Sequence, residues 1–266
     1  MEIEMNIGKT IAKSYVSGSG KQCNIITDVE RRTFGLGDDQ IKDALAGIKG
    51  KRPCDVFVRS PTPWNDLYAR YGWDQVQRIT TISDAKVLDI SVVPVLVNES
   101  ILENNSSYRG DFGTDLSTTL RNSVSSNWNK SHGISVEQKI TYGISFMVKG
   151  EGQTSFSYSH NWGHGGSESK TCSLGTSGNV KVSLGPGEKV IAQLVASRGR
   201  AKVEVDYHSY LTGGVALNYS RGHHGHHFWW EPIDSIMEQL DRENFHTSRE
   251  IINIEMYSNL RVNLKK

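Results

Sequence analysis

Histidine is concentrated in one short stretch of the chain, and a metal site would first be sought there. The stretch contains His223, His224, His226 and His227, followed by Phe228, Trp229 and Trp230. Imidazole is a frequent ligand of transition metals, so His227 could chelate a metal together with His223 or His224. Among cysteines and carboxylates, only Glu231 stands at ligand spacing nearby. We therefore predict no metal and no cofactor, and expect a turn with packed aromatic side chains or a contact for a glycan or headgroup.

Other motifs that would indicate an enzyme are incomplete. Gly18 to Lys21 partly matches a phosphate-binding loop, but Tyr15 stands at the position of its first glycine and Gln22 follows the lysine. The chain contains no H-E-x-x-H, no G-x-S-x-G and no EF-hand loop. We therefore predict a protein without enzymatic activity.

Aromatic residues recur in two short segments. They are Trp64, Tyr68, Tyr71 and Trp73 in the first segment, and Trp229 and Trp230 in the second. An exposed aromatic ring offers a flat face on which a sugar ring can stack, whereas a buried ring contributes to a core. We predict that these six residues contact a surface glycan or a glycoprotein receptor, with burial in the core as the alternative.

Composition excludes several classes of protein. The 266 residues carry 30 Lys and Arg against 29 Asp and Glu, so the balanced charge predicts no nucleic-acid partner. The longest apolar stretch, Val92 to Val97, is far shorter than the roughly 20 residues of a membrane-spanning helix. Three cysteines are too few for a disulfide framework. Met1 to Tyr15 does not read as a signal peptide. We nevertheless expect a secreted protein that enters a membrane when oligomeric, with a cytoplasmic location as the alternative.

The first hundred residues have mixed character. Asp39 is expected to cap a helix whose apolar positions run from Ile41 to Ile48, and Asn65 to cap a second helical turn. A short strand is expected over 55–59. A longer strand is expected from Val87 to Val97, where Pro94 indicates a sheet edge or a bulge.

Long alternating strands dominate the rest. They are expected over 189–197, 202–210 and 250–264, with a short helix from Pro232 to Leu240. The sequence thus predicts a mainly β protein with a smaller mixed α/β part at the N-terminus. We place the boundary between residues 84 and 85, giving units 1–84 and 85–266.

One hairpin of unusual length, at about 131–163, carries the functional prediction. Alternate positions on both of its strands are apolar or aromatic, and the intervening positions are mostly Ser, Thr and Gly. The apolar face comprises Ile134, Val136, Ile140, Tyr142, Ile144, Phe146, Val148, Phe156, Tyr158 and Trp162. Such a face suits lipid, and the other face, with Glu137, Lys139 and Lys149, suits a water-filled lumen. An ordinary half-buried sheet would also alternate, but its strands are usually near 5–6 residues long.

The segment from Ser123 to Thr171 resembles the membrane-insertion region of aerolysin-type β-pore-forming proteins, in the epsilon-toxin and mosquitocidal-toxin branch. The phrase GPGEKVIAQLVA at 185–196 is similar to the step that follows in that family. A second resemblance is to insect follicular-epithelium yolk proteins and their spherulin 2a relatives. It rests on RSPTPWNDLYARYGW at 59–73, NYS at 218–220 and GHHFW at 225–229. EIINIEMYSN at 250–259 fits both groups.

The resemblance implies an elongated fold of long, twisted antiparallel strands. It implies binding to a membrane surface, assembly of a homo-oligomer and donation of one hairpin per protomer to a transmembrane β-barrel. The alternatives are a secreted yolk, eggshell, storage or matrix protein that keeps the fold without making pores, and a glycan-binding module. Aspartate in place of Ile140 and Ile144 is expected to abolish pores with less effect on the soluble protein.

Overall fold

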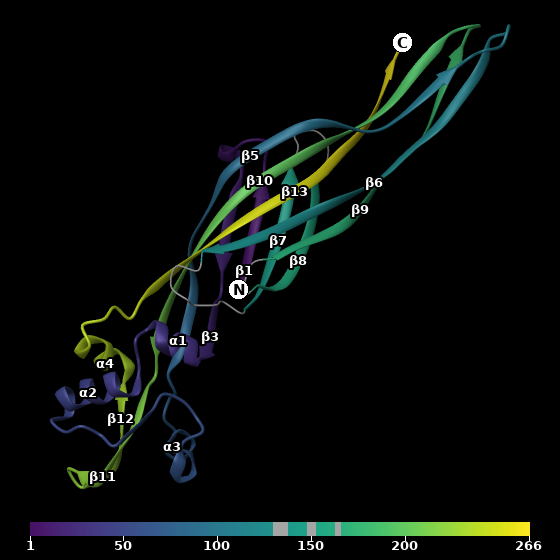
Figure 1. Ribbon diagram of the computed structural model, residues 1–266. Helices are drawn as coiled ribbons and strands as arrows, with labels where there is room; N and C mark the ends of the chain where they lie inside the picture. The colour runs from purple at the N-terminus through teal and green to yellow at the C-terminus, as the bar shows by residue number, and fades with distance from the viewer. Residues whose placement is uncertain (130–137, 148–152, 163–165) are drawn as a thin grey trace.

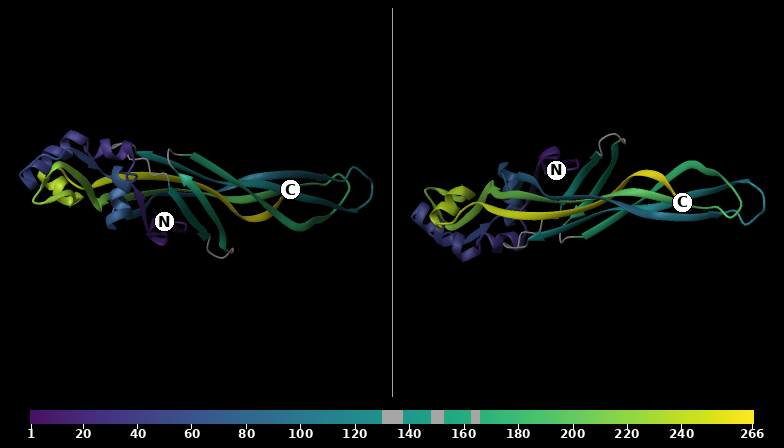
Figure 2. Two further views of the ribbon diagram at one scale, coloured as in Figure 1. Left: turned by 90° about the horizontal axis from the view of Figure 1, so that it is seen from below. Right: turned by 90° about the horizontal axis from the view of Figure 1, so that it is seen from above.

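The computed structural model describes residues 1–129, 138–147, 153–162 and 166–266. The molecule is elongated, with helices at one end and a long twisted sheet running to the other (Figure 1). Figure 2 shows the same elongation from two further sides, with the C-terminus toward the end of the sheet that lies away from the helices. The mainly β fold predicted from the sequence is confirmed.

The helical end, called the head below, combines elements from both ends of the sequence. It contains α1 (Asp28–Thr33), α2 (Asp38–Lys49), β4 (Asp55–Phe57), α3 (Pro63–Tyr71), β11 (Gly214–His223), β12 (His226–Pro232) and α4 (Ile233–Gln239). Strands β12, β11 and β4 form a small antiparallel sheet. Buried Phe34, Ile41, Leu45, Val215 and Ile236 belong to the hydrophobic core of the head.

Local sequence explains where the head helices begin. Thr27 and Glu30 form a reciprocal capping box at the start of α1, which satisfies backbone N–H groups that the helix leaves unpaired. Helix α2 confirms the apolar stripe from Ile41, but it begins at Asp38 with Gly37 at its N-cap, so the cap expected at Asp39 is wrong. Helix α3 follows Thr62 and begins with a proline, so the cap expected at Asn65 is also wrong.

The long sheet has the order β3-β5-β10-β13-β6-β9. Its strands are β3 (Lys21–Ile25), β5 (Gln77–Glu103), β6 (Gly110–Asn129), β9 (Gly166–Leu184), β10 (Lys189–Thr212) and β13 (His246–Lys265). The two strands expected over 189–197 and 202–210 are one continuous strand, β10, which pairs antiparallel with both β5 and β13. Strand β5 pairs with β3 only over 77–81, so Pro94, which stands opposite Ser197 of β10, lies where β5 is at the sheet edge, as the proline predicts.

A second, smaller sheet has the order β2-β1-β7-β8 and lies against the long sheet (Figure 1). It consists of β1 (Glu2–Ile7), β2 (Tyr15–Ser19), β7 (Gln138–Met147) and β8 (Gln153–Trp162), and a 3-10 turn at Ile11–Lys13 follows β1. Strands β7 and β8 form the predicted hairpin, with Tyr142 opposite Tyr158 and Ile144 opposite Phe156. The N-terminal strand β1 runs parallel to β7, from Glu2 beside Thr141 to Ile7 beside Phe146.

The long strands also bear on how the chain is organised. Strand β5 runs through residues 84 and 85 without a break, and α4 near the C-terminus contacts α2. The division into units 1–84 and 85–266 stays a prediction.

Candidate functional sites: the hairpin and the aromatic head

The described apolar side chains of β7 are buried against the long sheet. Ile140, Tyr142 and Ile144 have exposed fractions of 0%, 0% and 1%. They share one hydrophobic cluster with residues of β1, β6, β10 and β13, namely Ile3, Met5, Ile7, Val124, Val203, Val205, Tyr207, Ile252, Ile254 and Met256. The described part of the face that suits lipid is therefore covered by protein.

The other predicted hairpin residues are described only in part. Ile134, Val136, Glu137, Val148 and Lys149 lie outside the described residues. The backbones of Lys139, Phe146, Phe156, Tyr158 and Trp162 lie in β7 and β8, but their side chains are not described. The predicted lipid-facing and lumen-facing roles of all these residues stay predictions.

A buried carboxylate, which we did not identify from the sequence, joins the hairpin to the long sheet. Glu250 of β13 is 0% exposed. Its Oε1 accepts hydrogen bonds from Ser126 Oγ of β6 and from Tyr142 Oη of β7, the latter at 2.7 Å. Its Oε2 accepts one from Tyr207 Oη of β10 at 2.5 Å. Burial raises the pKa of Glu250 above its ordinary value, and the three hydroxyl groups offset part of that shift.

The alternation of side chains along β13 is the sequence feature from which the burial of Glu250 could have been predicted. Ile252, Ile254 and Met256 are buried on the inner face of this strand. Glu250 has the same parity, and side chains two residues apart in a strand point to the same face. A carboxylate that continues an inward apolar series is therefore expected to be buried and to need hydrogen-bond partners.

A partly exposed group of rings, called the aromatic patch below, lies on the head. It consists of Phe57, Trp64, Tyr71, Trp73 and Phe228. Trp64 and Tyr71 are 41% and 43% exposed. Tyr71 stacks on Trp73 with a 4.6 Å separation of ring centroids, and Trp64 lies 5.1 Å from Phe228.

Unusual backbone geometry presents Trp64 at the surface. Trp64, Asn65 and Asp66 all have positive φ, at 63°, 61° and 51°. Each such residue costs of order 1–2 kcal/mol, which surrounding contacts must offset, and such strain clusters at functional sites. Here the Oδ1 atom of Asp66 accepts from Ser60 Oγ, and the Thr62 hydroxyl accepts from the Leu67 N–H.

The other three residues predicted to contact a glycan, Tyr68, Trp229 and Trp230, are buried or half-buried in the head. Tyr68 is buried, and its hydroxyl donates to the Phe57 and Gly214 carbonyl oxygens, so its ring belongs to the core. Trp230 is half-buried and donates to the Asp74 carbonyl oxygen. Trp229 packs with the core of the head, beside the Lys49 ammonium group.

The four histidines form a turn packed around aromatic rings. His223 bonds to the Lys49 carbonyl oxygen and His227 to the Tyr219 carbonyl oxygen, while His226 meets Trp229 edge to face. Within the part of the chain that the structure describes, no group of three or more potential metal ligands is assembled.

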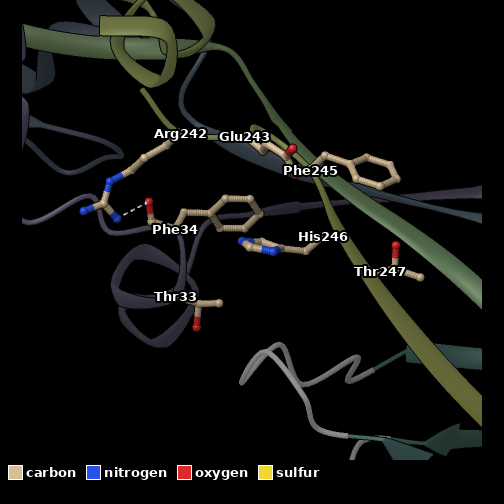
Figure 3. A pocket seen from close by; sticks show the side chains of 7 residues that line it. All are labelled: Thr33, Phe34, Arg242, Glu243, Phe245, His246 and Thr247. Atoms are coloured by element: carbon tan, nitrogen blue, oxygen red, sulfur yellow. Dashed lines mark hydrogen bonds between the residues drawn. The ribbon is translucent and has the colours of Figure 1, made fainter. Parts of the chain in front are cut away.

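A pocket that we did not predict from the sequence lies between α1 and the start of β13 (Figure 3). It is lined by Thr33, Phe34, Arg242, Glu243, Phe245, His246 and Thr247. Phe34 and His246 pack ring to ring at 4.5 Å, and Arg242 donates to the Phe34 carbonyl oxygen at 3.5 Å. These contacts hold α1 against the strand that carries Glu250.

The fold defines the class of the protein. It matches the crystal structure of parasporin-2, a Bacillus thuringiensis toxin that recognizes cancer cells, with a TM-score of 0.69 and 15% identity over 93% of this chain and 98% of that one. A non-toxic crystal protein from Bacillus thuringiensis matches with a TM-score of 0.54 and 10% identity over 91% of this chain and 96% of that one. The fold is aerolysin-like, so the resemblance found in the sequence is confirmed at this level.

Sequence relatives define the family more closely. U-megalopygitoxin(8)-Mo12 of Megalopyge opercularis is 31% identical over 255 residues, which is 96% of this chain and 88% of that protein. U-megalopygitoxin(8)-Mc8 of Megalopyge crispata is 32% identical over the same shares. No protein-family model matches the chain. The chain belongs to the U-megalopygitoxin(8) family. The expected likeness to yolk proteins stays a prediction.

Proposed function

We propose that this protein is a pore-forming toxin that binds a cell surface, oligomerises and inserts the β7–β8 hairpin into a transmembrane β-barrel. The observation that carries the proposal is the burial of Ile140, Tyr142 and Ile144 at an interface between two sheets. A hairpin in a separate sheet can leave without unpairing the long sheet. Moving its apolar face from protein to lipid costs little, because both surroundings are apolar.

Ring closure must accompany insertion. A lone hairpin in lipid would leave backbone N–H and C=O groups without partners, and each costs several kcal/mol there. A closed barrel made of one hairpin per protomer pairs all of them. We therefore place oligomerisation on the surface before insertion, with lipid and a receptor as the partners that concentrate the protein.

The aromatic patch is the proposed receptor contact. Trp64 and Tyr71 combine exposed rings with a strained backbone that the Asp66 and Thr62 hydrogen bonds hold in place. Stacking on aromatic faces suits the apolar faces of sugar rings, so a surface glycan or glycoprotein fits this patch. A protein that acts on a cell surface from outside must be secreted. We therefore also propose that this protein is secreted and enters a membrane when oligomeric. Among the described residues, no helix is long and apolar enough to cross a membrane.

A reversible crosslink tests the insertion step. Glu4 of β1 stands beside Gly143 of β7, and a Cβ atom built at Gly143 would lie 3.9 Å from Glu4 Cγ, which is ordinary contact. The double variant Glu4→Cys with Gly143→Cys, in a background where the native Cys23, Cys54 and Cys172 are serine, should form a disulfide that ties the hairpin to β1. We expect dye release from lipid vesicles only after reduction.

The two single cysteine variants are the matched controls, and both should release dye with or without reductant. Equal dye release by the oxidised and the reduced double variant would contradict insertion of this hairpin. A protein that releases no dye from glycolipid-containing vesicles in any form, and gives no rings by negative stain, would favour the alternative of a storage or matrix protein. The fold alone does not decide between them, because a non-toxic crystal protein shares it.

A further inference from the structure

Glu250 is a fully buried carboxyl group at the interface that the hairpin must leave. Its three partners come from three different strands: Ser126 from β6, Tyr142 from β7 and Tyr207 from β10. Two of these strands belong to the long sheet, as Glu250 does. Of these three partners only Tyr142 would depart with the hairpin, so release has to break its hydrogen bond to Glu250.

Charged groups near Glu250 in the sequence face away from it. Arg249 is paired with Asp206 at 2.7 Å and with Glu204 at 3.1 Å, and Lys86 is paired with Glu204 at 2.8 Å. Alternation puts these residues of β10 and β13 on the opposite face of the sheet.

Apart from its three partners and buried Ser248, the described side chains on the inner face around Glu250 are apolar. Strand β1 contributes Ile3, Met5 and Ile7 to the surrounding cluster. The described groups that can titrate and face Glu250 are therefore the two tyrosines, and no described cation pairs with its carboxylate.

We propose that Glu250 is a latch for the β7–β8 hairpin, which holds the hairpin while the carboxyl group carries a proton and favours its release when the group ionises. A negative charge buried away from bulk solvent, with no described cation paired to it, is unfavourable, and three hydroxyl donors compensate only part of that cost. Release of the hairpin admits water to the carboxylate. The identification of the moving segment rests on the proposed function.

The direction of the pH dependence follows from linkage. Burial raises the pKa of Glu250 in the stowed form, and contact with water on release returns it toward the ordinary value. Between those two values the stowed form binds one proton more than the released form. Release is therefore favoured as pH rises through this window, by about tenfold in the opening constant per pH unit. Acid holds the hairpin in place.

Hydrogen exchange in the absence of membrane measures this opening directly. Backbone amide exchange of β7 is followed from about pH 5 to about pH 9 in the wild-type protein and in Glu250→Gln, whose amide keeps the shape but cannot ionise. The variant has almost the same intrinsic exchange rates, so the ratio of the two profiles isolates the latch. We expect the ratio to rise about tenfold per pH unit over part of the range. A ratio independent of pH would overturn the latch.

Two phenylalanine variants separate a latch from a merely structural cluster. Tyr142→Phe removes a bond that exists only in the stowed form, so at high pH the exchange of β7 should rise about tenfold or more. Tyr207→Phe removes a bond that exists in both forms, so it should change that exchange much less. Equal effects of the two variants would also overturn the latch.

Failure of the latch and failure of the proposed function are distinguishable. A pH-dependent opening without dye release from vesicles would leave the latch standing and remove the pore. Dye release with a flat exchange ratio would do the reverse.

Discussion

Replacing Ile144 by alanine should loosen the hairpin much more than the rest of the protein. Ile144 is 1% exposed and lies in the cluster between the hairpin and the long sheet. Truncation of a buried isoleucine to alanine costs about 2–5 kcal/mol through lost burial and the cavity left behind. Because the hairpin belongs to a separate sheet, we expect most of that cost to appear as local opening. A loss of about 3 kcal/mol raises the opening constant on the order of a hundredfold.

Ile252 offers a matched control for that experiment. It is fully buried in the same cluster, but on β13, a central strand of the long sheet. Hydrogen exchange should show Ile144→Ala accelerating exchange in β7 and β8 selectively, with little change in β10 and β13. Ile252→Ala should instead lower the melting temperature and accelerate exchange throughout. Uniform acceleration in Ile144→Ala would refute the idea that the hairpin opens as a separate unit.

Three further outcomes are expected. Glu30→Gln removes the negative charge from the 2.9 Å ion pair with buried Arg78 and should cost about 3 kcal/mol, measured as a melting temperature lower by about 6 °C or more. Trp64→Ala should reduce binding to target cells at least about tenfold while changing the unfolding free energy by less than about 0.5 kcal/mol, and unchanged cell binding would remove this residue from the receptor contact. Gly213→Ala should yield little folded protein by circular dichroism, because φ is +80° and a Cβ atom would lie 1.9 Å from the Gln75 carbonyl oxygen.

Much of the fold could be predicted because its strands are long and regular. The alternation from Ile134 to Val148 and from Thr154 to Trp162 predicts a hairpin, and the structure pairs Gln138–Met147 with Gln153–Trp162. The helices were predicted from apolar spacing, which specifies the buried face better than it specifies the first residue. Gly37 and Thr62 precede α2 and α3, whereas side-chain type favours Asp39, two residues later, and Asn65, three residues later.

The position of the stowed hairpin could not be predicted. The alternation of apolar and polar side chains predicts that Ile140 and Ile144 share an apolar face, but it does not predict which residues cover that face. The covering residues come from β1, β10 and β13, which are far away in the sequence. This burial also changes the choice of test. Aspartate at Ile140 or Ile144 would place a charge in the core of the soluble form, so the milder effect on that form expected from the sequence is not supported.

The aromatic patch shows a second limit of sequence reasoning. Six aromatic residues were candidates for a glycan contact, and all are compatible with either exposure or burial. Exposure of Trp64 follows from three consecutive residues with positive φ, a conformation that side-chain type does not predict. Tyr68 is buried because its hydroxyl satisfies backbone carbonyl groups of the head. Spacing alone does not distinguish these two neighbours.

Strand pairing suggests why release of the hairpin and assembly of a ring belong together in the proposed mechanism. Among the described strands, β7 lies between β1 and β8, and β8 is the last strand of its sheet. Departure of β7 and β8 as a unit keeps their mutual bonds but breaks the parallel bonds to β1. In a ring, the freed edge of β7 can pair with the exposed edge of β8 from the next protomer. Each protomer then exchanges a parallel pairing for an antiparallel one, which is slightly more stable per residue, and no backbone edge is left facing lipid.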